Sequence, residues 1–403
     1  MADRLLSIGI LSVDLTRYAS RRSEQRSSWV GVAHAHAPLV LARFVMRCGS
    51  WTMSPEYSPS NYTPSAELLA ENATHSDLLC TDVPENAGRL KGPSLLVLAW
   101  FSHASRLQPR SRFIACADDD AYLHLAPMGI LDLLHRLPRG SCGQGGGTDA
   151  QRCDGSIGSS REKNEDEYIY VGAMHGWSIN HTSFVFRNFG WDGCGAGCDG
   201  PFPFATGSLM CVSHALAREV VSATAGAELA TVYSLSPHHK LFFHDPFLGQ
   251  AIYRLVPSGS RLPRLDVYNL DPWAQDTDGF RVAPSLLIWH NRHKMPCRVL
   301  CLGEYYREHA CGAAHTQYEW VVRRSKGRVD MSRYLMWDAR FKTAADKPNK
   351  EPRPGERVLA GEAAQANQSC HSVVDLRDPR TIAALNLSTC AACHQVVLAA
   401  RSG

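Results

Sequence analysis

The sequence predicts an α/β fold built around a parallel sheet. Short apolar runs alternate with segments of helical composition in the first third of the chain, a pattern typical of parallel strands joined by helices. Three consecutive aspartates, Asp118, Asp119 and Asp120, close one apolar run, and α/β folds bind ligands beyond the carboxyl ends of their strands. The chain has 403 residues, of which 44% are hydrophobic, so it can bury a large core.

Each element of this pattern can be placed along the chain. Apolar runs predict strands, and the polar, arginine-rich stretch that ends at Trp29 predicts the first helix. The predicted strands cover residues 5–13, 39–46, 77–80 and 112–117, and the other predicted helices cover residues 65–76 and 95–106. A further apolar run, residues 122–125, follows the aspartates.

The chain changes character twice after this region. Residues 140–167 are rich in glycine and then in charge, which predicts a flexible surface insertion. Residues 342–357 are rich in lysine, proline and glutamate, which predicts a linker. We therefore expect one main domain, residues 1–338, and a linker with a short cysteine-containing tail, residues 339–403.

Composition excludes one class of partner and favours one compartment. The net charge of +3 and the lack of a dense basic block with interleaved aromatics argue against nucleic-acid binding. Fourteen cysteines together with five Asn-x-Ser/Thr acceptors predict an oxidising lumen. The acceptors are Asn61, Asn72, Asn180, Asn367 and Asn386. The first ten residues lack the apolar run of a signal peptide or membrane anchor, so either an anchor lies outside this chain or the protein is not luminal.

The three aspartates concentrate negative charge at the end of a predicted strand. Carboxylates so close together repel, and a partly buried one must be paired, protonated or bound to metal. Oxygen ligands select hard cations such as Mg²⁺ or Mn²⁺, and Mg²⁺ often completes its shell with substrate phosphates. The cluster therefore predicts a site for a metal and a diphosphate. The alternative is a solvated acidic turn or the start of a helix.

Several short segments recur in an order and spacing that resemble one family. They are Arg22 to Trp29, the group Glu71, His75, Asp77 and Asp82, the run Asp118 to Leu123, Pro203 to Ser208, His244 to Gly249, and Leu287 to His290. Over about residues 5–295 they resemble the inverting glycosyltransferases of the β-1,3-galactosyltransferase and N-acetylglucosaminyltransferase type, glycosyltransferase family 31, of which Fringe is a relative. The glutamate that usually precedes the family's catalytic aspartate is His244 in this chain.

The resemblance implies a GT-A fold, with a Rossmann-like nucleotide-binding half and an acceptor-binding half around one mixed sheet. It also implies metal-dependent transfer of a hexose, galactose or N-acetylhexosamine, from a UDP-sugar to a glycan or glycoprotein acceptor. We expect inversion at the transferred sugar and a β-1,3 linkage. The expected location is the Golgi or ER lumen, in association with the membrane.

The resemblance also implies roles for individual residues. Asp245 is the expected catalytic base, and Asp120 and His290 are the expected ligands of Mn²⁺ or Mg²⁺. Asp118, Asp119, Arg22 and Arg26 are expected at the nucleotide, and Phe204, Gly207 and His244 are expected on the acceptor side. Simpler roles stay open for some of them. Asp245, which precedes a proline, could cap a helix, and His290, Arg22 and Trp29 could be ordinary core or surface residues.

Two further alternatives concern the tail and the activity. The tail contains Cys390-Ala391-Ala392-Cys393-His394, the spacing of a c-type haem attachment site. Zinc binding with Cys370 and His371 is a second possibility, and disulfides or free thiols are favoured over both. The rival to an active transferase is an inactive relative that binds glycans or nucleotide sugars. A metal-dependent phosphohydrolase would need more carboxylates than the sequence places at the site.

Overall fold

The computed structural model describes the core of the chain and part of its tail. The described residues are 4–47, 64–81, 93–125, 129–137, 168–180, 186–187, 198–225, 244–255, 265–270, 274–275, 281–282, 287–290, 299, 301–302, 304, 374–375, 379–393 and 395. The predicted insertion and the predicted linker lie outside them. Among the described helices, none is both long enough and apolar enough to cross a membrane.

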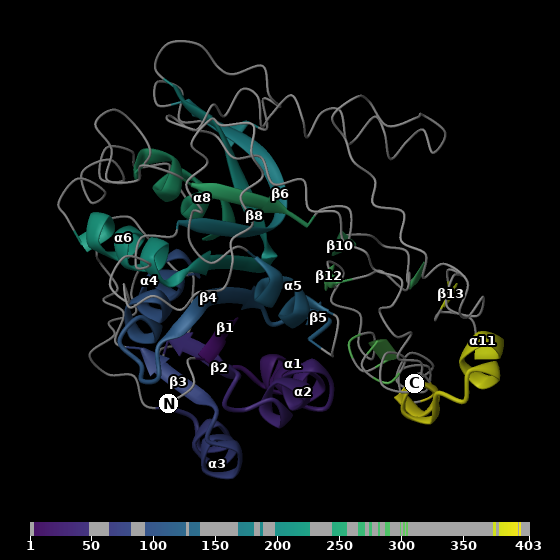
Figure 1. Ribbon diagram of the computed structural model, residues 1–403. Coiled ribbons are helices and arrows are strands. Elements are labelled where there is room, and N and C mark those ends of the chain that lie inside the picture. The colour runs from purple at the N-terminus through teal and green to yellow at the C-terminus, as the bar shows by residue number, and fades with distance from the viewer. Residues whose placement is uncertain are drawn as a thin grey trace, which may run out of the picture.

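A mixed eight-stranded sheet forms the centre of the molecule (Figure 1). Its strand order is β3-β2-β1-β4-β8-β6-β7, and β9 pairs with β6 on a separate branch. The strands are β1 (Arg4–Ser12), β2 (Val40–Arg47), β3 (Leu78–Thr81), β4 (Ser111–Asp118), β6 (Ile169–Asn180), β7 (Phe186–Arg187), β8 (Cys198–Ser213) and β9 (Asp266–Asn269). The structure thus has the α/β class that the sequence predicts.

The two halves of the sheet differ in direction. Strands β1 to β4 are parallel, as predicted. The mixed sheet that the resemblance implies is confirmed: the second half departs from the parallel pattern, since β8 is antiparallel to both β4 and β6, and β7 is antiparallel to β6. Only residues 181–185 separate β6 from β7, too short a connection for the crossover that parallel pairing requires.

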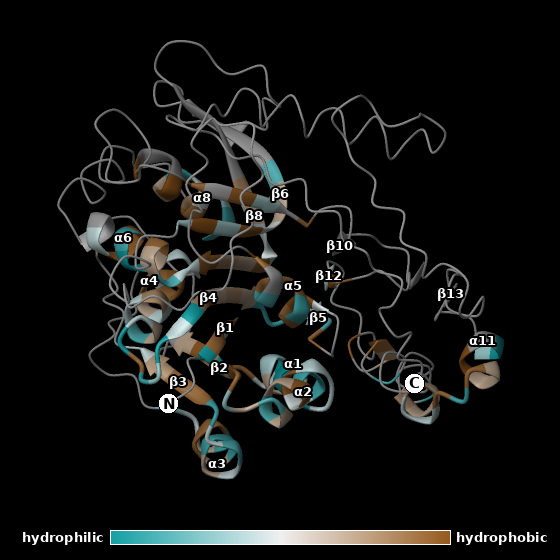
Figure 2. Cartoon of the chain, viewed as in Figure 1, coloured by the Kyte–Doolittle hydropathy of each residue, from teal (hydrophilic) through white to brown (hydrophobic). Residues whose placement is uncertain are grey.

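Helices cover both faces of the sheet. The described helices are α1 (Thr16–Arg26), α2 (Trp29–Ala35), α3 (Ala66–His75), α4 (Pro93–Ala104), α5 (Ile130–Arg136), α6 (His214–Ala225), α8 (His244–Leu255) and α11 (Pro379–Ala384), of which α11 lies away from the central sheet (Figure 1). Buried side chains of α4, α6 and α8 form one core with one face of the sheet, and those of α2 and α5 form a second core with the other face. Figure 2 shows the apolar residues on the central strands, whereas α1 is mostly hydrophilic.

Two small sheets lie beside the central one. Strand β5 (Ala121–Leu123) directly follows the aspartates and pairs with β12 (Ile288–His290), which in turn pairs with β10 (Ala274–Gln275). Strand β11 (Arg281–Val282) pairs with β13 (Val374–Asp375). The β5–β12 pair brings a late segment of the chain to the end of β4, and it determines the geometry of the site described below.

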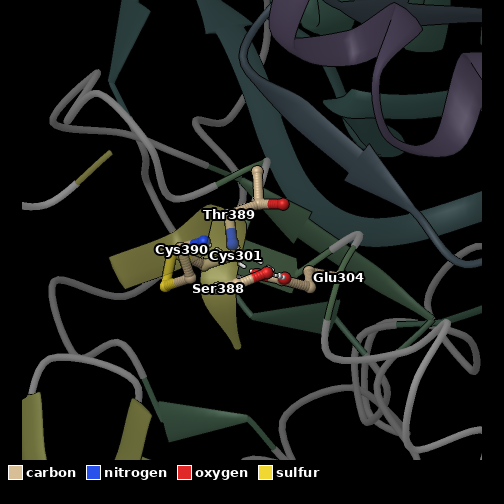
Figure 3. The surroundings of a disulfide bond; sticks show 5 residues. All are labelled: Cys301, Glu304, Ser388, Thr389 and Cys390. Carbon is tan, nitrogen blue, oxygen red and sulfur yellow. Dashed lines mark hydrogen bonds between the residues drawn. A yellow bond between two sulfur atoms is a disulfide. The ribbon is translucent and has the colours of Figure 1, made fainter. Parts of the chain in front are cut away.

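A disulfide and a set of hydrogen bonds link the C-terminal segment to residues 301 and 304 (Figure 3). A disulfide joins Cys301 to Cys390. Next to it the carboxylate of Glu304 accepts hydrogen bonds from the backbone N–H groups of Thr389, at 2.8 Å, and Cys390, at 2.7 Å, and from the Ser388 hydroxyl, at 3.3 Å. These bonds satisfy backbone donors that would otherwise have no partner.

The same segment also contributes to the core. Ile382, Leu387 and Cys390 are buried in the cluster that contains Trp289 of β12. Cys390 and Cys393 both form disulfides, so neither has a thiol free for haem attachment or zinc. The disulfide alternative is confirmed for these two cysteines, and the haem and zinc alternatives are wrong for them.

Candidate metal centre

The aspartates lie where the strand order of the sheet changes direction. From β1 the chain passes to β2 on one side, whereas β4 lies on the other side of β1. Leu11 of β1 pairs with Asp118, the last residue of β4, so both strands end at the same edge. In open α/β sheets such a point leaves a crevice at the carboxyl ends of the strands, which is where ligands bind.

His290 reaches the aspartates through the β5–β12 pair. In this antiparallel register His290 is opposite Ala121, the residue after Asp120. His290 Nε2 lies 3.3 Å from Asp120 Oδ1 and 3.7 Å from Asp118 Oδ2. One ligand atom from each of these three residues lies within 4.8 Å of the other two.

This set of donors fits a divalent cation. An ion about 2.0 to 2.4 Å from each ligand atom can bridge atoms that are less than 4.8 Å apart. Two carboxylates and one imidazole suit a divalent cation that accepts both oxygen and nitrogen ligands. The sequence predicted Asp120 and His290 as ligands, and the structure adds Asp118 to the group that could hold a metal.

Asp119 faces a different partner. Arg21 Nη1 lies 2.9 Å from Asp119 Oδ1 and 4.0 Å from Asp120 Oδ2, and the Ser12 hydroxyl donates to Asp119 Oδ2 at 3.4 Å. Burial and then the charge of Asp120 raise the pKa of Asp119 to about 7, against the opposing effect of Arg21. Burial and the repulsion from Asp120 together thus exceed what Arg21 offsets at Asp119.

Side chains of α1 and α2 hold the backbone of the aspartate turn. The Gln25 amide donates to the carbonyl oxygens of Asp118 and Ala121, both at 3.4 Å. The Trp29 indole donates to the Ala121 carbonyl at 3.0 Å. Trp29 and Gln25 are fully buried, so this support is fixed by packing. Trp29 is therefore a core residue that holds the aspartate turn, which agrees with the core role left open for it above.

A bulge in β8 brings Gly207 against Asp118. Between the pairs Gly172–Met210 and Met174–Ala205, β6 advances two residues while β8 advances five, and such bulges redirect a strand next to functional sites. A Cβ on Gly207 would overlap Asp118 Oδ2 and come within 2.8 Å of His244 Nε2. Only glycine therefore fits at this position.

His244 and Asp245 begin α8 beside this bulge. His244 Nε2 lies 3.0 Å from Asp118 Oδ1. Burial alone would lower the pKa of His244, but the charge and hydrogen bond of Asp118 raise it overall. His244 thus contacts Asp118 of the candidate metal centre directly. Its expected role on the acceptor side stays a prediction.

Asp245 is partly exposed in the first turn of α8. Burial of its carboxylate raises its pKa to about 6, against the effects of His244 and of hydrogen bonds from the backbone N–H groups of Asp245 and Gly207. A pKa near 6 suits a carboxylate that must accept a proton. The helix begins at His244, so Asp245 lies inside it and the helix-cap alternative is wrong.

Arg22 and Arg26 bind other side chains of the protein. Arg22 is 1% exposed and donates to both oxygens of Glu71 at 2.7 and 2.6 Å. Arg26 donates to both oxygens of Asp77 at 2.8 and 2.7 Å and lies 2.7 Å from Glu71. We call these four residues the arginine cluster. Contact with a nucleotide stays a prediction for Arg22 and Arg26, and the structure gives both a role in holding α1 to α3 and β3.

The remaining expected site residue is Phe204. It is buried on β8, and its ring centroid lies 5.9 Å from that of His175. Its role on the acceptor side stays a prediction. Sequence reasoning missed Arg21 and Gln25, which contact the aspartates from α1. The one available signal was their position on the predicted arginine-rich helix, because side chains three to four residues apart share a helix face.

Comparison with models of known protein families finds no family that matches this chain. Comparison with curated protein sequences finds no match either.

Proposed function

We propose that the protein is a metal-dependent inverting glycosyltransferase that moves a hexose from a UDP-sugar to a glycan or glycoprotein. The observation that carries the proposal is the convergence of Asp118, Asp120 and His290 within 4.8 Å at the carboxyl edge of the sheet. A further carboxylate, that of Asp245, accepts a hydrogen bond from the backbone N–H of Gly207, which itself lies against Asp118. A metal centre with a separate candidate base is what inverting transfer requires.

The fold supports the same proposal at a coarser level. Parallel strands in the order β3-β2-β1-β4 correspond to the order 3-2-1-4 of a nucleotide-binding half. The antiparallel strands β8 and β6 extend the same sheet and carry Gly207 and Phe204. A GT-A fold, with a donor half and an acceptor half around one mixed sheet, is our proposal for this architecture.

The proposed roles follow from charge. A bound divalent cation would stabilise the negative charge that gathers on the departing diphosphate. Asp118, Asp120 and His290 would hold it, with Mn²⁺ favoured over Mg²⁺ by the imidazole. Asp245 would accept the proton of the acceptor hydroxyl on the opposite face of the sugar, which gives inversion.

The disulfide between Cys301 and Cys390 supports an oxidising compartment such as the ER or Golgi lumen. Membrane association remains part of the proposal, since the resembling family is anchored there.

A donor panel tests the proposal. Purified protein with Mn²⁺ and each of several UDP-sugars should release UDP, faster with a glycan acceptor than without one, and EDTA should abolish the release. Asp245→Asn should lower transfer by about 10² to 10⁴-fold and leave Mn²⁺-dependent donor binding within a few-fold of the unsubstituted protein. Donor binding without any release of UDP would indicate the inactive, sugar-binding relative. Binding of none of the donors would refute the transferase proposal.

A further inference from the structure

Arg21 uses few of its hydrogen-bond donors within the protein. A guanidinium carries five N–H groups in a planar fork. Nη1 of Arg21 donates to Asp119 Oδ1 at 2.9 Å, and within the described part of the chain neither its Nε nor its Nη2 has a hydrogen-bond partner. Arg22 and Arg26, by contrast, each donate to both oxygens of one carboxylate. Of these three arginines of α1, Arg21 is the one with donors left for a ligand.

The Arg21 guanidinium lies beside the candidate metal centre, on the other side of Asp120. Nη1 of Arg21 is 4.0 Å from Asp120 Oδ2, whereas His290 Nε2 is 3.3 Å from Asp120 Oδ1. The two oxygens of one carboxylate therefore face the guanidinium and the histidine. The side chain of Arg21 is 17% exposed, so a ligand from solvent can reach it.

Tyr18 restricts the Arg21 side chain. The central carbon of the guanidinium, Cζ, lies over the Tyr18 ring, 4.6 Å from the ring centroid. The two residues are three positions apart and so share a face of α1. Because this cation–π contact and the bond to Asp119 already order the side chain, it loses less conformational entropy when it binds an anion.

We infer that Arg21 binds the diphosphate of the nucleotide donor, next to the cation held by Asp118, Asp120 and His290. The inference deepens the function proposed above and rests on it. A diphosphate bound to that cation would be within reach of the guanidinium, since Asp120 contacts both sides. Nε and Nη2 form one edge of the fork, the edge with which Arg22 holds Glu71. Such an edge binds a phosphate through two parallel N–H bonds.

The test measures two affinities in the full chain by calorimetry, first for Mn²⁺ alone and then for UDP at saturating Mn²⁺. Arg21→Met should weaken UDP binding about ten-fold or more, because it removes hydrogen bonds to a charged group. It should leave the affinity for Mn²⁺ alone unchanged or raise it, because it removes a positive charge beside the cation. Arg21→Lys keeps the charge and loses the fork, so its UDP affinity should be intermediate.

Matched variants separate Arg21 from its surroundings. Arg17→Met removes an exposed arginine that contacts the same Tyr18 ring, and it should bind UDP as the unsubstituted protein does. If Arg21→Met does not fold, Arg21→Met combined with Asp119→Asn takes its place and is compared with Asp119→Asn alone. The combined change leaves no carboxylate without its guanidinium at Asp119.

Equal UDP affinity in Arg21→Met and Arg17→Met would overturn the role of Arg21 and leave the proposed transferase intact. A loss of affinity for both Mn²⁺ and UDP in Arg21→Met would also overturn it, because a residue that only supports the fold would lower both. Failure of the unsubstituted protein to bind UDP with Mn²⁺ would overturn the proposed function together with the inference.

Discussion

Two clusters of charged side chains share one edge of the sheet and differ in charge balance. The arginine cluster sets two guanidiniums, Arg22 and Arg26, against two carboxylates, Glu71 and Asp77. Among the described residues, the aspartate cluster, Asp118 to Asp120, sets three carboxylates against one guanidinium, that of Arg21, and two imidazoles, which are charged only when protonated. The two clusters meet at Ser12, whose hydroxyl accepts from Arg22 and donates to Asp119.

The difference indicates which cluster serves the scaffold and which serves a ligand. A buried set of charges that neutralises itself needs nothing from outside the chain. A set with excess negative charge is costly until a cation or a proton arrives. The balance of positive and negative charge therefore distinguishes the arginine cluster from the aspartate cluster more clearly than the number of charged residues does.

Breaking the arginine cluster should give the largest effect on stability. Arg22→Met leaves the carboxylate of Glu71 without its bidentate partner, and loss of one member of a buried pair costs about 3 to 5 kcal/mol. Chemical denaturation should show this loss, and Arg22→Met with Glu71→Leu should recover part of it. Arg17→Met, at an exposed arginine of the same helix, is the control. If Arg22→Met were as stable as Arg17→Met, the arginine cluster would have no role in stabilising the fold.

Removing one charge from the aspartate cluster should have the opposite effect on stability. Asp120→Asn should lower Mn²⁺ affinity by about 100-fold, because it removes a candidate ligand. In the absence of metal it should leave the free energy of unfolding unchanged or raise it, because it relieves repulsion from Asp119. Calorimetric titration and thermal unfolding measure the two quantities. Unchanged Mn²⁺ affinity would refute a metal-binding role for Asp120.

Gly207→Ala should weaken the metal centre without touching a ligand. The added Cβ would overlap Asp118 Oδ2 and crowd His244, so Asp118 must move. We expect Mn²⁺ affinity to fall about ten-fold and the melting temperature to fall by a few degrees. Gly172→Ala, in the facing strand, tests packing between β6 and β8 alone, because its Cβ would meet Ala205 and Leu209. An equal loss of Mn²⁺ affinity in both variants would argue against a specific role for Gly207.

The two clusters should also respond to pH with opposite signs in metal-free protein. Arg22 and Arg26 lower the pKa of Glu71 against the effect of its burial, so its contribution is present above about pH 4.5 and is lost as the pH falls further. The pKa of Asp119 is raised to about 7, so its ionisation removes stability as the pH rises from about 4 to about 7. The melting temperature of Glu71→Gln should approach that of the unsubstituted protein as the pH falls below about 4.5, and that of Asp119→Asn should rise relative to the unsubstituted protein as the pH rises from about 4 to about 7. If the melting temperatures of both variants changed with pH in the same way as that of the unsubstituted protein, the opposite roles of Glu71 and Asp119 would be contradicted.

Local pattern was enough to predict the parallel half of the sheet. Each of its strands is a short apolar run, and the aspartates end one of them, so their place at the sheet edge follows from sequence. The antiparallel half was not predictable in this way, because pairing direction depends on connections and not on hydrophobic pattern.

The site shows a similar division. His290 is 170 positions from Asp120, and only the register between β5 and β12 brings them together. No local pattern contains that register, and the resemblance to a family was the only source for it. Arg21 and Arg22 are neighbours in sequence and point to different clusters, because successive helical residues project about 100° apart. Which of the two faces the aspartates depends on packing.

The anchoring of the C-terminal segment has a practical consequence for shortened forms of the protein. Ile382, Leu387 and Cys390 share a core with Leu287, Ile288 and Trp289, the residues that precede His290. A form that stops at residue 338 would remove these buried side chains from the core cluster and leave Cys301 without its disulfide partner. Assays of such a form would measure a protein whose core is incomplete, so functional work should use the chain through the residues that follow Cys390.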